Sequence, residues 1–159
     1  MYQRNKLPAF EGVSGGNTAT VRLPIGWRYH YLYLAYSGVT LAQMTEIRVK
    51  ANGRVIHRYS PTSYNVINRF DGRATANGIY TIAFNRYGLL DRVFEEMSAL
   101  LTGINAPYAD GSTITQVEVE IDIDAAAAAP ALQLYSDRSL YNPNQPYFMR
   151  TIETLNRDM

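Results

Sequence analysis

A run of strict alternation is the feature that most constrains what this chain can fold into. From Val117 to Asp124, aliphatic residues alternate without interruption with carboxylates, in the order Val-Glu-Val-Glu-Ile-Asp-Ile-Asp. Successive side chains on a β-strand point to opposite faces of the sheet, so this run has an apolar face and an acidic face. We therefore predict a long strand over residues 114–124 that buries only its apolar face.

The acidic face of this strand needs compensation, because like charges at alternate positions repel each other at a spacing of about 7 Å. It carries four carboxylates: Glu118, Glu120, Asp122 and Asp124. We favour pairing with Arg48 and Lys50, which lie on the outward face of another predicted strand. The alternatives are a structural calcium ion, held by oxygen ligands at Asp122 or Asp124, and simple solvation.

A β-hairpin is the clearest local signal in the chain. The dipeptide Asn52-Gly53 lies between two runs, 46–51 and 54–59, that are rich in β-branched residues. Both turn residues tolerate a positive φ angle, which a type I′ turn requires. Aliphatic and charged residues alternate in the first run, so we expect the aliphatic side chains to face the core.

An aromatic run over residues 29–36 predicts a further strand. Strict alternation places Tyr29, Tyr31 and Tyr33 on one face, and two leucines with His30 on the other. Both faces are largely apolar or aromatic, which indicates a strand that is central in its sheet or covered on its outer side. Tyrosine suits half-buried strand positions and protein interfaces, and the chain contains 13 of them.

Three weaker strand signals complete the set, at residues 18–23, 78–85 and 131–136. The first alternates threonine and arginine with aliphatic residues, so it also has one buried face. Between the acidic strand and the last strand lie five alanines followed by Pro130, which we interpret as a tight passage of small residues across a subunit or domain surface.

Two short helices are predicted between the strands. Ser60 and Pro61 have the character of an N-cap and a first helical residue, and the first helix should end at Gly72. Its apolar stripe would consist of Tyr64, Ile67 and Phe70. The second helix would cover residues 90–101, with Gly103 as its C-cap.

The fold class that follows is all-β, an antiparallel β-sandwich with two short inserted helices. We divide the chain into an N-terminal arm and loop (1–17), a sandwich domain (18–140) and a C-terminal linker or arm (141–159). A doubly wound fold is disfavoured, because the strand–helix–strand rhythm that it requires does not occur.

Composition excludes several classes of function. The net charge of +1 gives no long-range attraction to nucleic acid or to an anionic membrane, so no specific nucleic acid is expected as a partner. The chain has no cysteine, which rules out disulfides and thiolate metal sites. No apolar run approaches the roughly 20 residues of a membrane-spanning helix, and the polar N-terminus does not have the pattern of a signal peptide.

Catalytic patterns are weak. Residues 12–16 match G-x-S-x-G, but Ser14 precedes a strand instead of connecting a strand to a helix, as a nucleophile elbow requires. The two histidines, His30 and His57, have no partner at metal-ligand spacing. We therefore expect a protein that is not an enzyme and holds no cofactor apart from the calcium considered above.

A set of short motifs, taken in order, resembles the major capsid protein of corticoviruses, which are tailless bacteriophages with an internal membrane. The resemblance covers roughly residues 7–150. The motifs are Leu23-Pro24-Ile25-Gly26, Tyr36-Ser37-Gly38-Val39-Thr40, Ile47-Arg48-Val49, Gly53-Arg54-Val55-Ile56 and Ile121-Asp122-Ile123-Asp124-Ala125-Ala126-Ala127 through Pro130.

The resemblance implies a sandwich of jelly-roll type, specifically the first half of a double jelly roll that trimerises into a pseudo-hexagonal capsomer of an icosahedral shell. Its partners would be further copies, other capsid proteins and an internal virion membrane, which Arg4 and Lys6 would be placed to reach. The protein would be made in a bacterial cytoplasm and reside in the virion, from a free virus or a prophage. The second jelly roll of the family has no counterpart in these 159 residues.

The alternative function is a carbohydrate-binding jelly-roll module. Such a module would present Tyr29, Tyr31 and Tyr33 as solvent-exposed rings on a concave face, whereas a capsid subunit would bury them against a sheet or a neighbouring subunit.

Overall fold

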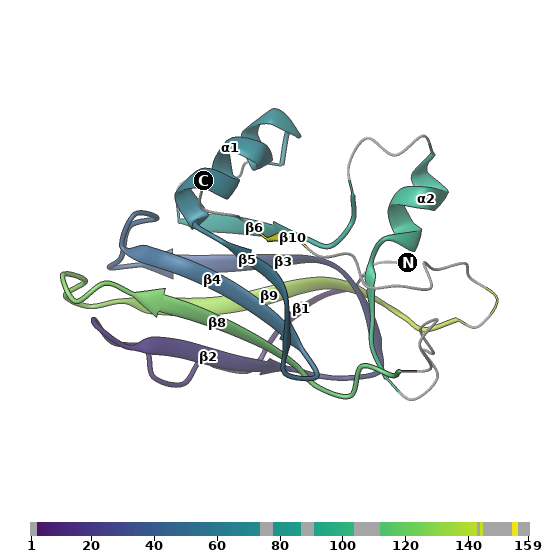
Figure 1. Ribbon diagram of the computed structural model, residues 1–159, viewed down its shortest axis with the longest axis horizontal. Helices are drawn as coiled ribbons and strands as arrows, with labels where there is room; N and C mark the ends of the chain where they lie inside the picture. Colours follow the sequence, from purple (N-terminus) through teal and green to yellow (C-terminus); the bar gives the residue numbers. More distant parts are fainter. Residues whose placement is uncertain are drawn as a thin grey trace.

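The structure is a computed structural model that describes residues 3–73, 78–86, 91–103, 112–142, 144 and 154–155. Two β-sheets face each other, and their inner faces form the core (Figure 1). Sheet A has the order β1 (Gln3–Lys6), β9 (Ala131–Leu140), β3 (Trp27–Ser37) and β6 (Ile79–Ala83), with β7 (Leu100–Leu101) also paired to β3. Sheet B has the order β10 (Thr154–Leu155), β5 (Arg54–Tyr59), β4 (Met44–Ala51), β8 (Val117–Ile123) and β2 (Thr18–Leu23).

The strand pairing is that of a jelly roll. Four antiparallel pairs are nested in the chain, the outermost joining β1 to β9, the next β2 to β8, then β3 to β6, and the innermost β4 to β5. This is the arrangement of one long hairpin rolled into two sheets, with β7 and β10 as additions. The predicted fold, an antiparallel jelly-roll sandwich with two short inserted helices, is confirmed.

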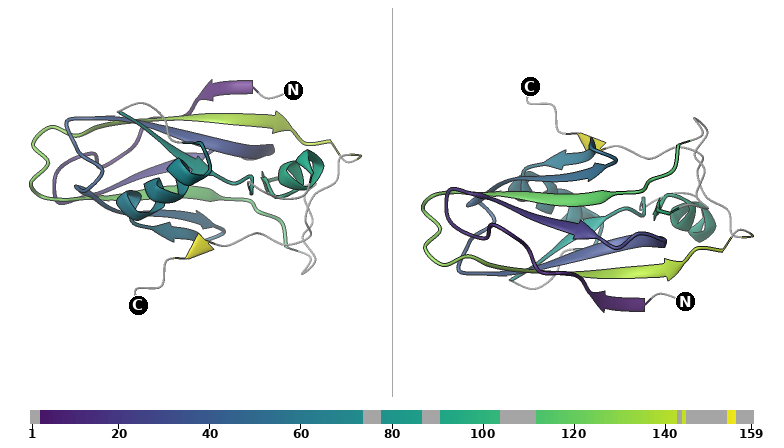
Figure 2. Two further views of the ribbon diagram at one scale, coloured as in Figure 1. Left: turned by 90° about the horizontal axis from the view of Figure 1, so that it is seen from above. Right: turned by 90° about the horizontal axis from the view of Figure 1, so that it is seen from below.

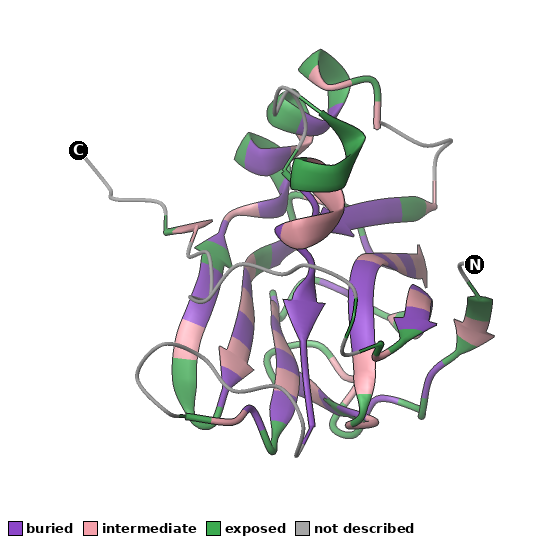
Figure 3. Cartoon of the chain, turned by 90° about the vertical axis from the view of Figure 1, so that its right-hand side faces the viewer, coloured by how far each residue is buried: buried purple, intermediate pink, exposed green. Residues whose placement is uncertain are grey.

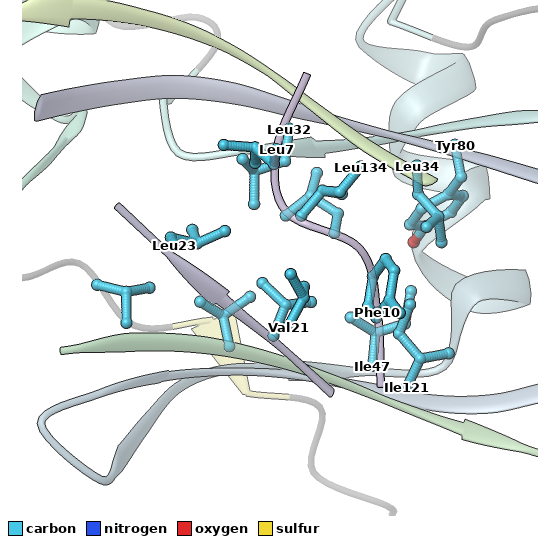
Figure 4. Packing of buried hydrophobic residues seen from close by; sticks show 14 of the residues in the cluster. Leu7, Phe10, Val21, Leu23, Leu32, Leu34, Ile47, Tyr80, Ile121 and Leu134 are labelled. Atoms are coloured by element: carbon cyan, nitrogen blue, oxygen red, sulfur yellow. The ribbon is translucent and has the colours of Figure 1, made fainter. Parts of the chain in front are cut away.

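The core lies between the two sheets and takes its side chains from both (Figure 4). Every second residue of β8 is buried, and the intervening carboxylates are not, as the alternation predicted. In sheet A, Leu32, Leu34 and Leu134 are fully buried opposite Ile47 and Ile121 of sheet B. Burial of this kind stabilises the fold by about 25 cal/mol for each square ångström of apolar surface removed from water.

The predicted hairpin is confirmed at β4 and β5. Asn52 and Gly53 form its turn with φ angles of 50° and 79°. The Asn52 side chain also fixes the chain that leads into β8, because its Oδ1 accepts a hydrogen bond from the backbone N–H of Thr115 at 2.9 Å. The register shifts by one residue after Val49, because β5 contains an extra residue, Ile56, between Val55 and His57.

A bulge in β3 changes the predicted facing of its tyrosines. Tyr29 pairs with Arg138 and Tyr31 with Asp137, so His30 is an extra residue in the ladder. The bulge turns Tyr29 into the core, where it is fully buried and its hydroxyl donates to the Pro24 carbonyl at 2.6 Å. Grouping Tyr29 with Tyr31 and Tyr33 was therefore wrong, because strict alternation fails across a bulge.

Helix α1 (Pro61–Phe70) begins where the Ser60–Pro61 pair predicted. Its buried face consists of Pro61, Tyr64 and Asn68. The predicted apolar stripe is wrong beyond Tyr64, because Ile67 and Phe70 point to solvent. The buried side-chain nitrogen of Asn68 donates a 2.8 Å hydrogen bond to the Thr81 carbonyl.

Helix α2 (Arg92–Met97) is shorter than predicted. It ends at Ser98, and Leu100 and Leu101 leave the helix to pair with β3 as β7. Gly103 is therefore not its C-cap; it has a φ angle of 113° and lies so close to Gly26 that a Cβ atom would come within 2.9 Å of the Gly26 Cα. Leu90 lies outside the described residues.

Helix α1 connects β5 of one sheet to β6 of the other, and α2 lies apart from it on the same side of the sandwich (Figures 1 and 2). Tyr64 of α1 stacks on Tyr59 at 4.2 Å and approaches Tyr80 at 6.4 Å, so that an aromatic cluster joins β5, α1 and β6. Within the described part of the chain, no helix has the length and apolarity needed to cross a membrane.

The described ends of the chain add strands to both sheets. Residues 3–6, expected as part of an arm, form β1 on the edge of sheet A, and Leu7 and Phe10 enter the core. The last predicted strand is longer than expected, because β9 continues past Ser136 to Leu140. Thr154 and Leu155 pair in parallel with β5, while the rest of 145–159 lies outside the described residues.

The alanine-rich passage after β8 is a tight turn region at one end of the sandwich. Gly38 has a φ angle of 66°, and a Cβ atom there would collide with the Ala129 carbonyl at 1.9 Å. Gly15 approaches the Ala127 carbonyl in the same way. Small residues are needed on both sides, because backbone meets backbone at this point.

Candidate assembly surfaces

The outer face of sheet B is a ladder of ion pairs. Arg48 of β4 lies between two carboxylates of β8, donating to both oxygens of Asp122 at 2.6 and 2.8 Å and to Glu120 at 2.9 Å. Lys50 donates to the other oxygen of Glu120 at 2.6 Å. These contacts exist because the β4–β8 register places Arg48 opposite Glu120. The predicted pairing of the acidic strand with Arg48 and Lys50 is confirmed.

The ladder holds its carboxylates in the ionised form. The Arg48 hydrogen bonds lower the pKa of Asp122, assisted by the Thr18 hydroxyl, which donates to it at 2.6 Å. Burial opposes ionisation of Glu120, but the hydrogen bonds from Lys50 and Arg48 outweigh it, so the pKa of Glu120 is also lowered. This surface satisfies its own charge and needs no external partner.

The weak metal candidates occupy different settings. Asp122 uses both carboxylate oxygens within the ladder. Asp124 is exposed beyond the end of β8, and its Oδ1 accepts the backbone N–H of Ala126 at 2.7 Å. The described residues contain no cluster of three or more histidine, aspartate or glutamate side chains able to hold a metal ion. Calcium at Asp122 or Asp124 stays a prediction.

The outer face of sheet A is aromatic. The rings of Tyr31 and Tyr33 stack at 6.3 Å between centroids. The Tyr31 hydroxyl donates to Glu95 of α2 at 3.1 Å, and the Tyr33 hydroxyl donates to Asp137 of β9 at the same distance. Burial raises the pKa of Tyr33 to about 12, so this phenol is a neutral donor at physiological pH.

A bidentate ion pair anchors β1 to this aromatic face. Arg4 donates from Nε and Nη2 to the two oxygens of Asp137, each at 2.8 Å, and its guanidinium lies 4.6 Å from the centre of the Tyr33 ring. Burial opposes ionisation of Asp137, but the hydrogen bonds from Arg4 and Tyr33 lower its pKa. Sequence reasoning missed Asp137 because the predicted strand stopped at Ser136; Arg4 was considered only for contacts outside the domain.

A hollow opens on the same face. It encloses about 470 Å³ and is lined by Arg4, Tyr33, Ala35, Ile79 and Tyr135. Its floor comes from β3 and β9, where Tyr33 lies directly opposite Tyr135, and its far side is formed by β6, where Ile79 lies opposite Ala35. The hollow is thus an apolar, aromatic concavity with a single cation at its edge.

A third surface is formed by the outward sides of the two helices, which are largely exposed (Figure 3). Phe70 of α1 is 90% exposed and Val66 is 65% exposed, with Ile67 beside them. On α2, Phe94 is 47% exposed and is accompanied by Val93. Single exposed apolar residues are common on monomers, but several on one short helix make its outward side a candidate contact surface.

Ser14 and the two histidines, which were considered as catalytic or metal-binding residues, lie in separate parts of the fold. Ser14 lies in the loop before β2, where its hydroxyl accepts from the Asn17 amide at 2.6 Å. His30 and His57 are buried in different sheets, His30 between Asn85 and Ser139, and His57 against the ring of Phe84. Burial lowers the pKa of each to about 4, so both are neutral structural side chains at physiological pH.

Comparison with known sequences identifies relatives. The family described as viral coat protein P2 N-terminal domain matches residues 4–139. The chain is 31% identical over 102 residues to the major capsid protein P2 of Pseudoalteromonas phage PM2, an alignment that covers 60% of this chain and 38% of the relative.

Comparison with solved structures agrees. The crystal structure of the PM2 major capsid protein P2 superposes with a TM-score of 0.74 at 28% identity, covering 89% of this chain and 52% of the other. The capsid of PBCV-1 shares the fold, with a TM-score of 0.58 at 11% identity over 89% of this chain and 42% of that one. This chain thus spans about half or less of the length of the relatives it matches. Since the family match runs through nearly all of the jelly roll, from β1 to β9, the chain belongs to the viral coat protein P2 N-terminal domain family.

Proposed function

We propose that this chain is a structural, non-enzymatic subunit domain of a viral capsid shell. The observation that carries the proposal is the family match over residues 4–139, supported by superposition on the PM2 major capsid protein. A shell protein works by presenting fixed surfaces to its neighbours, so its chemistry lies in contacts and not in an active site. The protein would reside in the virion after synthesis in a bacterial cytoplasm.

The arrangement of surfaces supports assembly through sheet A and the helices. Sheet B has its charges paired within the domain, whereas the hollow and the exposed face of α1 leave apolar area in water. Protein interfaces bury aromatic and apolar residues and leave charged pairs at the rim. Lateral contacts between copies would therefore use the aromatic side of the molecule.

The finer parts of the proposal concern the assembly. We propose a trimer, a closed ring in which lateral contacts repeat by rotation about one axis. A second jelly roll, reached through the linker or arm of residues 141–159, would complete a pseudo-hexagonal outline with other capsid proteins around it. Contact with an internal membrane would fall to exposed residues such as Lys6, because Arg4 is engaged by Asp137.

Light scattering of the purified chain over a concentration series tests this function. We expect a mass of three chains that falls towards one on dilution. The same samples on a glycan array test the carbohydrate-binding alternative, which already lacks one of its three rings, since Tyr29 is buried. A monomer at all concentrations that binds a glycan would overturn the capsid proposal.

A further inference from the structure

The side chain of Asn52 connects the turn of the β4–β5 hairpin to the segment that leads into β8 (Figure 1). Its Oδ1 accepts hydrogen bonds from the backbone N–H groups of Thr115 and Gln116, at 2.9 and 3.2 Å, and from the Thr115 hydroxyl at 3.2 Å. Its Nδ2 donates to the Thr113 carbonyl at 2.8 Å. We call these four hydrogen bonds the Asn52 bridge; together they use both ends of the side-chain amide.

The Asn52 bridge holds the end of the sandwich at which β8 begins. Ile114, within the bridged segment, is buried in the core with 3% of its surface exposed, and its carbonyl accepts a hydrogen bond from the Gly103 N–H at 2.9 Å. Gly103 follows β7 of sheet A, so the bridge fixes a segment that joins the two sheets. Loss of the bridge would loosen Ile114 and the entry of the interior strand β8.

The turn alone does not explain why position 52 is an asparagine. Asn52 has a φ angle of 50°, and a type I′ turn accepts aspartate or glycine at this position as well. Aspartate, however, has no N–H to donate to the Thr113 carbonyl and would place a carboxylate oxygen against it, and glycine has no side chain to form the bridge. The amide group is therefore the part of the residue that the structure uses.

An asparagine followed by a glycine is also the dipeptide most open to spontaneous deamidation, because glycine has no side chain to hinder the attack. The backbone nitrogen of Gly53 attacks Cγ of Asn52, the Cγ–Nδ2 bond breaks, and the amide leaves as ammonia with the proton of the attacking nitrogen. Water then opens the resulting succinimide ring at either carbonyl carbon, which gives aspartate or isoaspartate. Both residues are exposed, so water reaches them.

The native fold opposes the first step of this reaction. Cyclisation requires the side-chain amide to turn towards the Gly53 nitrogen, and this movement breaks the hydrogen bonds to residues 113–116. The nitrogen that has to leave is itself held by the Thr113 carbonyl. One net hydrogen bond changes an equilibrium by about tenfold, so the reaction should proceed almost entirely from molecules in which the bridge has opened.

We propose that Asn52 is a site of spontaneous deamidation that the native fold keeps closed, and that its conversion releases the segment leading into β8. Aspartate at this position loses the bond to Thr113, and isoaspartate also adds a methylene group to the main chain of the turn. The conversion is irreversible, so every opening that ends in reaction leaves a chain loosened at this end. The inference rests on the Asn52 bridge and is independent of the capsid function.

Peptide mapping of the full chain by mass spectrometry tests the protection of Asn52. The chain is incubated in mildly alkaline buffer, folded in one series and unfolded in urea in the other, and the conversion of Asn52 is followed over time. We expect conversion to be at least about tenfold slower in the folded chain. Asn77-Gly78 is the same dipeptide elsewhere in the sequence and serves as the internal reference, because the two should convert at similar rates in urea.

Two matched variants test the release of the segment. Asn52→Asp copies one product of the reaction, and we expect it to lower the thermal midpoint by roughly 4 °C and to speed hydrogen exchange at Ile114. Asn17→Asp is the control, because the exposed Asn17 amide donates to the Ser14 hydroxyl, which can rotate and donate to a carboxylate instead. It should lower the midpoint by less than about 1 °C.

Each part of the proposal has a result that would overturn it. Equal conversion of Asn52 in the folded and the unfolded chain would show that the fold gives no protection. A midpoint of Asn52→Asp that is unchanged, or lowered only as far as that of Asn17→Asp, would show that the bridge does not hold the entry of β8. The conversion rates are measured on the parent chain, so they decide the first part even where Asn52→Asp does not fold.

Discussion

The two outer faces of this sandwich solve the problem of exposed strands in opposite ways. On sheet B, β8 presents carboxylates and β4 presents Arg48 and Lys50, and the register brings them within hydrogen-bonding distance. On sheet A, β3 and β9 present tyrosines around the ion pair of Arg4 with Asp137 and leave an apolar hollow. One face is complete within the chain, and the other is suited to a partner.

The difference between the two faces indicates which of them is better suited to bind another subunit. A face whose charges are mutually satisfied gains little by losing its water, because desolvation of ion pairs offsets the attraction. An aromatic face gains from every square ångström that it buries. We therefore expect the ion-paired face of sheet B to associate less readily than the aromatic face of sheet A.

Lowering the pH should have the largest effect on the free energy of unfolding, because the two buried histidines lie in different sheets and both resist protonation. The pKa of His30 and that of His57 are about 4 in the folded chain, against about 6.5 when unfolded. Between these values the unfolded state binds the extra protons, so stability is present above pH 6.5 and is lost as the pH falls towards 4. We expect a loss of roughly 2 kcal/mol for each histidine between pH 7 and pH 4.5, measured by urea unfolding.

A variant separates this loss from the titration of the faces. His57 packs edge-on against Phe84, so His57→Phe keeps the ring contact and removes the titrating group. It should remove about half of the pH dependence between pH 6.5 and 4.5. A parent chain whose unfolding free energy stays constant over that interval would show that neither histidine is held neutral by burial.

Introducing a cation on each of the two faces tests the comparison most directly. Ile79→Arg places a cation in the hollow beside Arg4, and we expect it to weaken association by about 100-fold, since an unpaired charge would be buried at the contact. Thr45→Arg makes a matched change on sheet B and should leave association unchanged. Sedimentation of both variants measures the effect, and equal losses would show that the two faces do not differ in their role.

The ladder on sheet B should matter for stability and not for association. Arg48→Met leaves Glu46, Glu120 and Asp122 close together without their shared cation, and we expect a loss of about 2 kcal/mol in unfolding free energy. The control is Arg22→Met, whose side chain is 77% exposed in its pair with Glu118 and should cost less than about 0.5 kcal/mol. An equal cost for both would mean that the ladder is an ordinary solvated surface.

The sequence predicted the two-layer fold and the ladder because both depend on local alternation. In residues 117–123 and 46–51 the alternation of residue types shows which side chains point inward and which point outward. Once these two strands pair, the outward Arg48 lies opposite the outward Glu120. The jelly-roll topology came from the resemblance, since pairing between β1 and β9, at opposite ends of the chain, has no local signal.

The aromatic side was harder to predict, for identifiable reasons. The bulge at His30 reverses the facing of Tyr29, and an extra residue in a ladder has no sequence signature here. Phe70 has the spacing of a core residue but is turned outward, because the polar Asn68 takes the buried position by bonding to Thr81. Tertiary contacts overrode helical periodicity at this point.

The smallest effect is expected at the aromatic cluster that joins the two sheets beneath α1. The Tyr59 hydroxyl is buried and, among the described residues, has no hydrogen-bond partner. Burial also raises its pKa, so it stays protonated and unpaired. Tyr59→Phe removes a desolvated polar group while keeping the stack on Tyr64, and we expect a gain of up to about 1 kcal/mol in unfolding free energy. Association should not change, because the hollow and the outward face of α1 are untouched. A stabilised variant that associates less would show that the cluster also positions the outward face of α1.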